Sequence, residues 1–170
     1  KRSNDGVMLK DSRIIYGIMD FTPEDLSGSI YLYHNNCHHF IDHIGIPNLF
    51  IEHENRILIS DSFNKIIYAY EINNFNNKEV WLDLSSQSFT PDGGCIGPDG
   101  NIYIAMWGGG FIAKYKDNGR LLDKIELKAK QPTNCVFGPK ETIYITSASE
   151  GLSHDELEQF PDSGYLIEKK

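Results

Sequence analysis

Four polar side chains recur along the chain at nearly constant spacing and are the first candidates for chemistry. Asn4, Asn48, Asp92 and Asn134 are separated by 44, 44 and 42 residues. Amide and carboxylate oxygens that converge on one point suit a divalent cation; Ca²⁺ is the first choice, with Mg²⁺ and Zn²⁺ as alternatives. Asn and Asp also cap turns, which is the alternative interpretation of each position taken alone. The chemistry therefore depends on whether the fold brings successive repeats together.

The segments that must position these side chains are short strands. An apolar run rich in Ile and Tyr begins about nine residues after each position, at residues 13–17, 56–60, 101–105 and 142–146. Further strands are expected at 29–33, 66–70, 111–115 and 165–168, and fourth strands at 39–43, 80–84 and 121–127. Four short strands per unit, at a period in the low forties, are typical of β-propeller blades. We therefore predict an all-β fold, a β-propeller of which this chain supplies about four four-stranded blades.

Residues 91–110 display the repeat most clearly. We interpret residues 91–93, Pro-Asp-Gly, as an acidic turn, and residues 98–100, also Pro-Asp-Gly, as the turn of a hairpin. In a propeller, the turn that enters each innermost strand points toward the central channel. The four polar positions are accordingly expected to converge there. The best helix candidate is a short turn at residues 153–157.

The composition limits the classes of partner. A net charge of −8 and a pI of about 5.2 argue against a nucleic-acid backbone, whose phosphates require clustered Lys and Arg. No apolar run approaches the length of a membrane span, and the basic start is not followed by the apolar stretch of a signal peptide. The three cysteines form no CxxC pair, so we expect reduced, mostly buried thiols and a cytoplasmic protein.

The repeat also predicts an incomplete ring. The sequence begins at the polar element of one blade, and its last blade ends after the third strand. A closed propeller removes such exposed edges. We expect residues 1–170 to form a single propeller domain that further blades or a second chain complete, with a closed four-bladed ring as the alternative.

Several segments together resemble a known family. These are IPN followed by ILISDSFNKIIYAYEI, then TPDGGCIGPDGNIYIAMWGGGFIAKYKDNGRLL, then PTNCVFGPKETIYITSASEGL. They are similar to the senescence marker protein/gluconolactonase/regucalcin-like family, which includes luciferin-regenerating enzymes. The resemblance implies a six-bladed propeller with a divalent metal at the centre of one face. It also implies that this chain corresponds to the last four blades, the C-terminal two-thirds of the family domain.

The resemblance assigns roles to two of the recurring residues. It implies that Asn48 and Asp92 are two of three protein metal ligands, and the third, a glutamate in the first blade, has no equivalent here. Asp92 also matches the family's catalytic acid/base, since a carboxylate beside the cation can remove a proton from the attacking water. Pure ligation is the alternative role of Asp92, and the two roles are compatible.

The resemblance also implies a substrate site at the start of the chain. Arg2 and Asn4 match the family's substrate-contacting Arg-x-Asn-Asp-Gly, and their side chains can bond sugar oxygens. A frayed terminal cation is the alternative for Arg2. Two positions depart from the family: the position of a substrate-contacting glutamate of the family falls near Thr22 in this sequence, and Leu49 stands where the family usually has glycine. The loop at Asn48 is therefore expected to differ.

Other chemical motifs receive structural interpretations. A histidine cluster with Cys37 lies on a predicted turn and outer strand, so we favour a surface hairpin over a zinc site. The cluster consists of His34, His38, His39 and His43. Trp107 and the glycines after it predict a bend rather than a phosphate loop. Cys95 and Cys135 sit in apolar strands and are expected to pack rather than react.

These observations lead to two functional hypotheses. The first is metal-dependent hydrolysis of a sugar lactone of the gluconolactone type, in which the metal polarises the carbonyl and Asp92 activates water. The second is a non-catalytic or calcium-binding regulatory module, a truncated propeller that another chain completes. No sequence motif of a covalent serine hydrolase is present.

Overall fold

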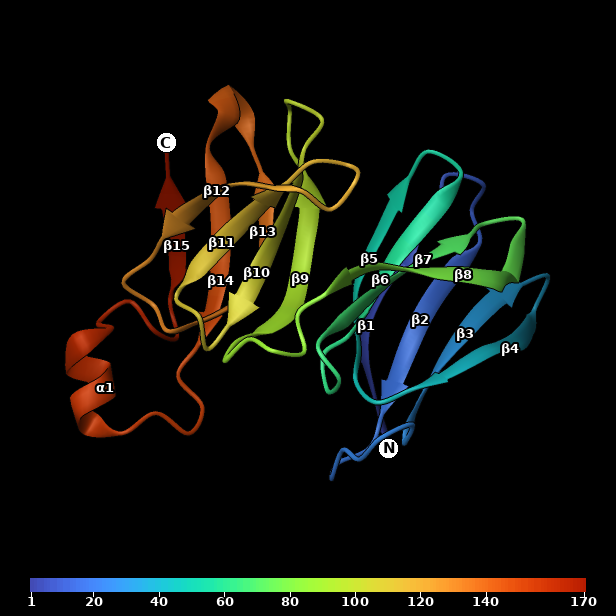
Figure 1. The fold of residues 1–170 in the computed structure, drawn as a ribbon, viewed down its shortest axis with the longest axis horizontal. Helices are drawn as coiled ribbons and strands as arrows, with labels where there is room; N and C mark the ends of the chain where they lie inside the picture. Colours follow the sequence, from blue (N-terminus) through green and yellow to red (C-terminus); the bar gives the residue numbers. More distant parts are fainter. The chain divides into compact units, whose positions relative to one another are not determined.

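The computed structural model describes residues 1–170, which form fifteen strands in four antiparallel sheets (Figure 1). The first sheet consists of β1 (Arg2–Met8), β2 (Ile14–Met19), β3 (Gly28–His34) and β4 (Cys37–Ile44). The second consists of β5 (Pro47–His53), β6 (Arg56–Asp61), β7 (Ile66–Glu71) and β8 (Asn74–Asp83). The third consists of β9 (Thr90–Ile96), β10 (Ile102–Trp107), β11 (Phe111–Tyr115) and β12 (Leu121–Glu126). The fourth consists of β13 (Gln131–Phe137), β14 (Ile143–Ala148) and β15 (Leu166–Lys169).

Within each sheet, consecutive strands pair with one another, which is the meander expected of a propeller blade. Every predicted strand is present, so the prediction of an all-β propeller chain is confirmed. Three sheets have four strands, and the last has three, as the sequence pattern predicted.

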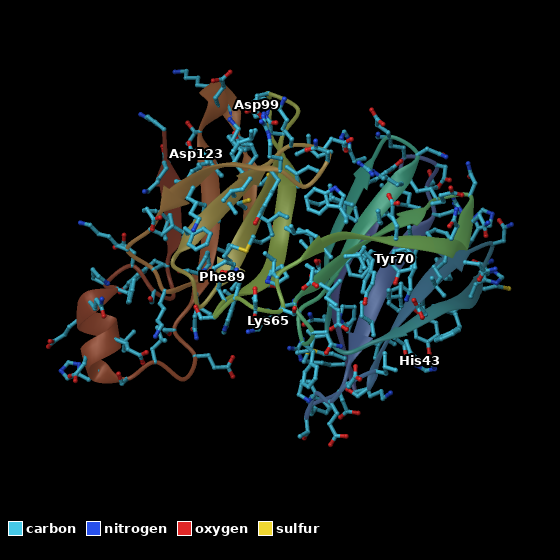
Figure 2. All side chains as sticks on the ribbon, viewed as in Figure 1. His43, Lys65, Tyr70, Phe89, Asp99 and Asp123 are labelled. Carbon is cyan, nitrogen blue, oxygen red and sulfur yellow. The ribbon has the colours of Figure 1, made fainter.

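The chain divides into two compact units, Lys1–Gln87 and Ser88–Lys170, each made of two sheets. In the first unit, β5 lies against β1 and β2, and the sheets bury an apolar core between them. Its centre includes Ile15, Ile30, Ile57 and Ile59. Tyr70 of β7 is buried in the same core (Figure 2). Its hydroxyl donates a hydrogen bond to Asp42 Oδ2 at 3.0 Å.

The second unit is built in the same way. β13 packs against β9 and β10, and the core between them includes Tyr103, Ala105, Cys135 and Ile145. A 3₁₀ turn (Pro139–Glu141) joins β13 to β14, and the short helix α1 (His154–Gln159) follows β14.

The helix begins with a reciprocal cap. The Ser153 hydroxyl accepts the Glu156 backbone N–H, and the Glu156 carboxylate accepts the Ser153 N–H. The predicted helical turn is therefore confirmed. None of the helical segments has the length and apolar character that a membrane-spanning helix requires.

Candidate functional site

The predicted polar positions lie at irregularities in the innermost strand of each sheet. In β1, Asn4 and Asp5 together face Gly17 of β2, and in β9, Asp92 and Gly93 together face Ala105 of β10. Two residues that oppose one form a β-bulge, which re-aims side chains and is common beside functional sites. The interpretation of residues 91–93 as a turn is therefore wrong, because these residues belong to β9 and the chain bends there without leaving the sheet.

The other two positions occupy the same place in the register. Asn48 of β5 pairs with Ser60, and Asn134 of β13 pairs with Thr146, with a register shift beside each pair. Ser60 and Thr146 end the same repeated apolar run that Gly17 and Ala105 end in the other two sheets. The spacing of the four polar residues in the sequence thus corresponds to one shared position in the four sheets.

In the first unit, three of the predicted site residues form a continuous hydrogen-bonded chain. Arg2 Nη1 donates to Asn4 Oδ1 at 2.8 Å, and Asn4 Nδ2 donates to Asn48 Oδ1 at 2.8 Å. Asn4 Nδ2 also donates to the Pro47 carbonyl at 3.0 Å. Asn48 Nδ2 in turn donates to Ser62 Oγ at 3.1 Å. The two predicted substrate residues and one predicted metal ligand therefore orient one another.

The bulge that presents Asn48 holds an unusual residue. Leu49 has a φ of 56°, in the left-handed region that favours glycine, and its side chain is fully buried. The family resemblance implies that glycine is usual at this position, and the backbone conformation explains why glycine suits it. Burial of the leucine side chain offsets the backbone strain.

The carboxylate of Asp5 supports this bulge from the neighbouring sheet. It accepts backbone hydrogen bonds from Leu49 and Phe50, and also from Gly6 at 2.8 Å. Burial raises the pKa of Asp5, and these hydrogen bonds lower it by a smaller amount. Asp5 therefore positions the Asn48 segment, a role that the sequence analysis did not identify.

In the second unit, the corresponding positions meet through backbone rather than through side chains. A Cβ added to Gly93 would lie 2.5 Å from Asn134 Cγ, so the Asn134 side chain rests directly on the Gly93 backbone. Asn134 Oδ1 accepts the N–H of Cys135 at 2.8 Å. Asp92, which precedes Gly93, is half-buried. The absence of a side chain at Gly93 therefore allows the bulge of β9 and the bulge of β13 to lie together.

The oxygen chemistry of these residues suits a hard cation, although the donor set within each unit is small. Asn48 Oδ1 accepts one hydrogen bond and keeps a second lone pair, and the Ser62 hydroxyl beside it is neutral. Asp92 is the one carboxylate among the four recurring positions. No group of three or more His, Cys, Asp or Glu residues is arranged to hold a metal ion. Ca²⁺, which takes six to eight oxygen ligands, would need ligands beyond Asn48 and Asp92.

The histidine cluster forms a surface hairpin, as predicted. His38 pairs with Tyr33 and His39 pairs with Leu32, so these consecutive histidines point to opposite faces of the sheet. His38 Nδ1 is 2.7 Å from the Tyr16 hydroxyl.

The other motifs also proved structural. Gly108 and Gly110, after Trp107, have positive φ in a tight bend between β10 and β11, with no helix behind them. Asp61 is buried and accepts backbone N–H groups from Gly45 and Ile46, so it anchors a turn. Ser62, the next residue, accepts a hydrogen bond from Asn48. Only its position directly after a repeated strand could have indicated this contact from the sequence.

Comparison with known proteins gives consistent relatives. The family described as SMP-30/Gluconolactonase/LRE-like region matches residues 1–149. Regucalcin from Gallus gallus is 28% identical over 180 residues, covering 96% of this chain and 60% of its own. L-arabinolactonase from Azospirillum brasilense is 24% identical, and the match covers 96% of this chain and 58% of that protein. A 6-deoxy-6-sulfogluconolactonase from Pseudomonas putida is 31% identical over 114 residues, and the match covers 64% of this chain and 39% of that protein.

Solved structures agree with the fold. A calcium-binding protein, regucalcin from Agrobacterium tumefaciens, superposes with a TM-score of 0.88 at 26% identity, over 98% of this chain and 60% of its own. A luciferin-regenerating enzyme superposes with a TM-score of 0.85 at 22% identity, over the same shares. The chain therefore spans about 60% of the length of the Gallus gallus and Agrobacterium tumefaciens regucalcins.

Proposed function

The chain belongs to the SMP-30/gluconolactonase/LRE-like family, and from this premise we propose that it hydrolyses a sugar lactone with the help of a divalent cation. The observation that carries the proposal is the hydrogen-bonded series of Arg2, Asn4 and Asn48, in which Asn4 and Asn48 occupy the register position that Asp92 occupies in its own sheet. Relatives named as lactonases support the reaction class. Because the chain spans about 60% of its relatives, the proposal includes completion of the site by further blades.

The proposed cation is Ca²⁺, with Zn²⁺ and Mg²⁺ as alternatives, and Asn48 and Asp92 would contribute to holding it. The calcium-binding description of the Agrobacterium relative supports this choice. A cation bound there supplies Lewis-acid polarisation of the lactone carbonyl. The family resemblance implies a third protein ligand, a glutamate in an earlier blade. In this proposal that glutamate would come from outside residues 1–170.

The hydrogen bonds of Asn4 restrict what it can offer to a substrate. The Nδ2 atom of Asn4 donates both of its hydrogen bonds to protein acceptors, the Pro47 carbonyl and Asn48 Oδ1. Only the Oδ1 atom of Asn4 can therefore form a further hydrogen bond, as an acceptor. Asn4 would therefore accept a hydrogen bond from a sugar hydroxyl. Arg2 keeps further N–H donors beyond those bonded to Asn4 and Ser3, and these would donate to sugar oxygens.

Asp92 would act as the general base. Its carboxylate takes a proton from water as the water oxygen bonds to the lactone carbonyl carbon. The ring C–O bond then breaks, and the departing alkoxide takes up the proton, which leaves a hydroxy acid. A half-buried carboxylate is accessible enough for this exchange and is still partly shielded from bulk solvent.

Hydrolysis of gluconolactone with and without Ca²⁺ or Zn²⁺ tests the proposal. Asp92→Asn removes the base while keeping the size of the side chain, and we expect a loss of at least about 100-fold in rate. Asp123→Asn is the matched control, because Asp123 is an exposed carboxylate on β12 of the same unit (Figure 2). Equal rates for Asp92→Asn and the control protein would overturn the assignment.

A second candidate function is a non-catalytic or calcium-binding module that another chain completes. Two observations favour it: the last sheet has three strands, and outer faces of the sheets carry exposed apolar side chains. Phe40, 52% exposed, packs against Tyr31 on the first sheet, and Leu166, 67% exposed, lies on the last. Mass measurement in solution separates the candidates. A monomer without lactone turnover supports the module, whereas a larger active assembly supports an enzyme completed in trans.

A further inference from the structure

Two cysteines that lie 40 residues apart in the sequence meet in the core of the second unit. Cys95 of β9 and Cys135 of β13 place their Sγ atoms 3.8 Å apart. Their strands are the innermost strands of successive sheets, and both thiols are free. An S–S bond is about 2.05 Å long, so the two sulfurs need to approach by only ~1.8 Å to form one.

The surroundings of the two thiols differ in a way that suits stepwise oxidation. Cys135 is 4% exposed, and its Sγ atom lies 3.6 Å from the Tyr103 carbonyl oxygen. Cys95 is half-buried, so solvent reaches it. The hydrogen bond from Cys135 lowers the pKa of the Cys95 thiol, which favours the thiolate at the more accessible of the two sulfurs.

Small oxidants reach the pair through Cys95. Cys135 pairs with Ile145, and both side chains lie in the core on the face of the last sheet opposite Asn134 and Val136.

We propose that Cys95 and Cys135 are an oxidisable dithiol site, which hydrogen peroxide converts into a disulfide linking β9 to β13. The Cys95 thiolate attacks one peroxide oxygen and the O–O bond breaks, which leaves a sulfenic acid on Cys95 and releases water after protonation. Cys135 sulfur then attacks the sulfenic sulfur, the S–S bond forms, and hydroxide departs with the Cys135 proton as a second water. Two thiols are oxidised, and one peroxide is reduced to two waters.

The disulfide would join the two strands that carry the polar bulges of the second unit. Cys95 lies three residues after Asp92, and Cys135 directly follows Asn134. The bond would close a loop of about 40 residues and restrict the unfolded chain. Oxidation is therefore expected to raise the midpoint of thermal unfolding by about 5–10 °C.

Peroxide treatment followed by peptide mapping tests the proposal. The reduced protein is exposed to one equivalent of hydrogen peroxide, the remaining thiols are alkylated, and the peptides are analysed without reduction. We expect a linked peptide pair containing Cys95 and Cys135, about 2 Da lighter than the two reduced peptides together. Cys37, exposed at the β3–β4 turn of the first unit, is the internal control and is expected to remain outside this linkage.

Two variants complete the test. Cys37→Ser is expected to form the same linked pair at an unchanged rate. Cys135→Ala is expected to stop at a Cys95 sulfenic acid, which dimedone traps. Recovery of Cys95 and Cys135 as unlinked alkylated peptides, under conditions that oxidise Cys37, would overturn the proposal, and so would linkage of Cys95 to Cys37. The wild-type and Cys37→Ser measurements decide the question even if Cys135→Ala fails to fold.

Discussion

The two units place a polar residue at the same position of each sheet but stabilise that position differently. In the first unit, side-chain hydrogen bonds hold this position: Asn4 donates to Asn48, and the Asp5 carboxylate accepts N–H groups of the Leu49 bulge. In the second, the bulge contains Gly93, and the Asn134 side chain rests on its backbone. Equivalent geometry thus depends on hydrogen bonds in one unit and on close backbone approach in the other. The difference predicts that equivalent substitutions have unequal effects.

The largest contrast is expected at the residue opposite each bulge. Gly17 faces the bulge of β1, and a Cβ there would lie 2.4 Å from Pro47 Cγ, a rigid ring. Ala105 faces the bulge of β9 and already has a buried Cβ. Gly17→Ala should therefore lower the free energy of unfolding by about 2–3 kcal/mol through overpacking. Ala105→Gly should lower it by about 1 kcal/mol. Urea unfolding of both variants measures this difference, and equal losses would contradict the comparison.

The next contrast concerns the polar residues themselves. Asn4→Ala removes the donor to Asn48 Oδ1 and the Pro47 carbonyl, so we expect a loss of about 1–2 kcal/mol in the free energy of unfolding. Asn134 is exposed, and Asn134→Ala should change stability by less than about 0.5 kcal/mol. If Asn134→Ala proved the more damaging variant, hydrogen bonding would not distinguish the two units.

A smaller effect tests the conformation of Leu49. Truncation to Ala or Gly removes the same buried contacts except for one methyl group, but only glycine adopts positive φ without strain. We therefore expect Leu49→Gly to be more stable than Leu49→Ala by about 0.5–1 kcal/mol, the reverse of the usual order in strands. The usual order, with the Ala variant more stable, would indicate that the bulge does not hold residue 49 at positive φ.

The most subtle effect is a pH dependence at Asp5. Because the folded protein raises the pKa of Asp5 above 3.8, its stabilising contribution is fully present below that pH. The contribution is lost as the pH rises through the folded pKa, since burial then opposes the charged form. Asp5→Asn should lack this dependence, and unfolding midpoints of both proteins measured from about pH 3 to pH 7 would reveal it. Parallel pH profiles would show that Asp5 titrates as it does in the unfolded chain.

The sequence by itself determined the strands, their grouping into sheets and the recurrence of one polar position per sheet. Short apolar runs rich in Ile and Tyr and turn-forming Pro-Asp-Gly or Asp-Asn-Gly segments encode these features locally, so the sequence alone predicts them. The capping box of α1 was equally local, because Ser153 and Glu156 are three residues apart.

Only the tertiary structure decided how the polar residues are held. Residues 91–93 have the composition of a turn, yet pairing with β10 keeps them in a strand as a bulge. The contact of Asp5 with the Leu49 bulge and the approach of Cys95 to Cys135 each join residues about 40 positions apart, on neighbouring sheets. Such contacts depend on how one sheet packs on the next, and no local pattern of residue types specifies that packing.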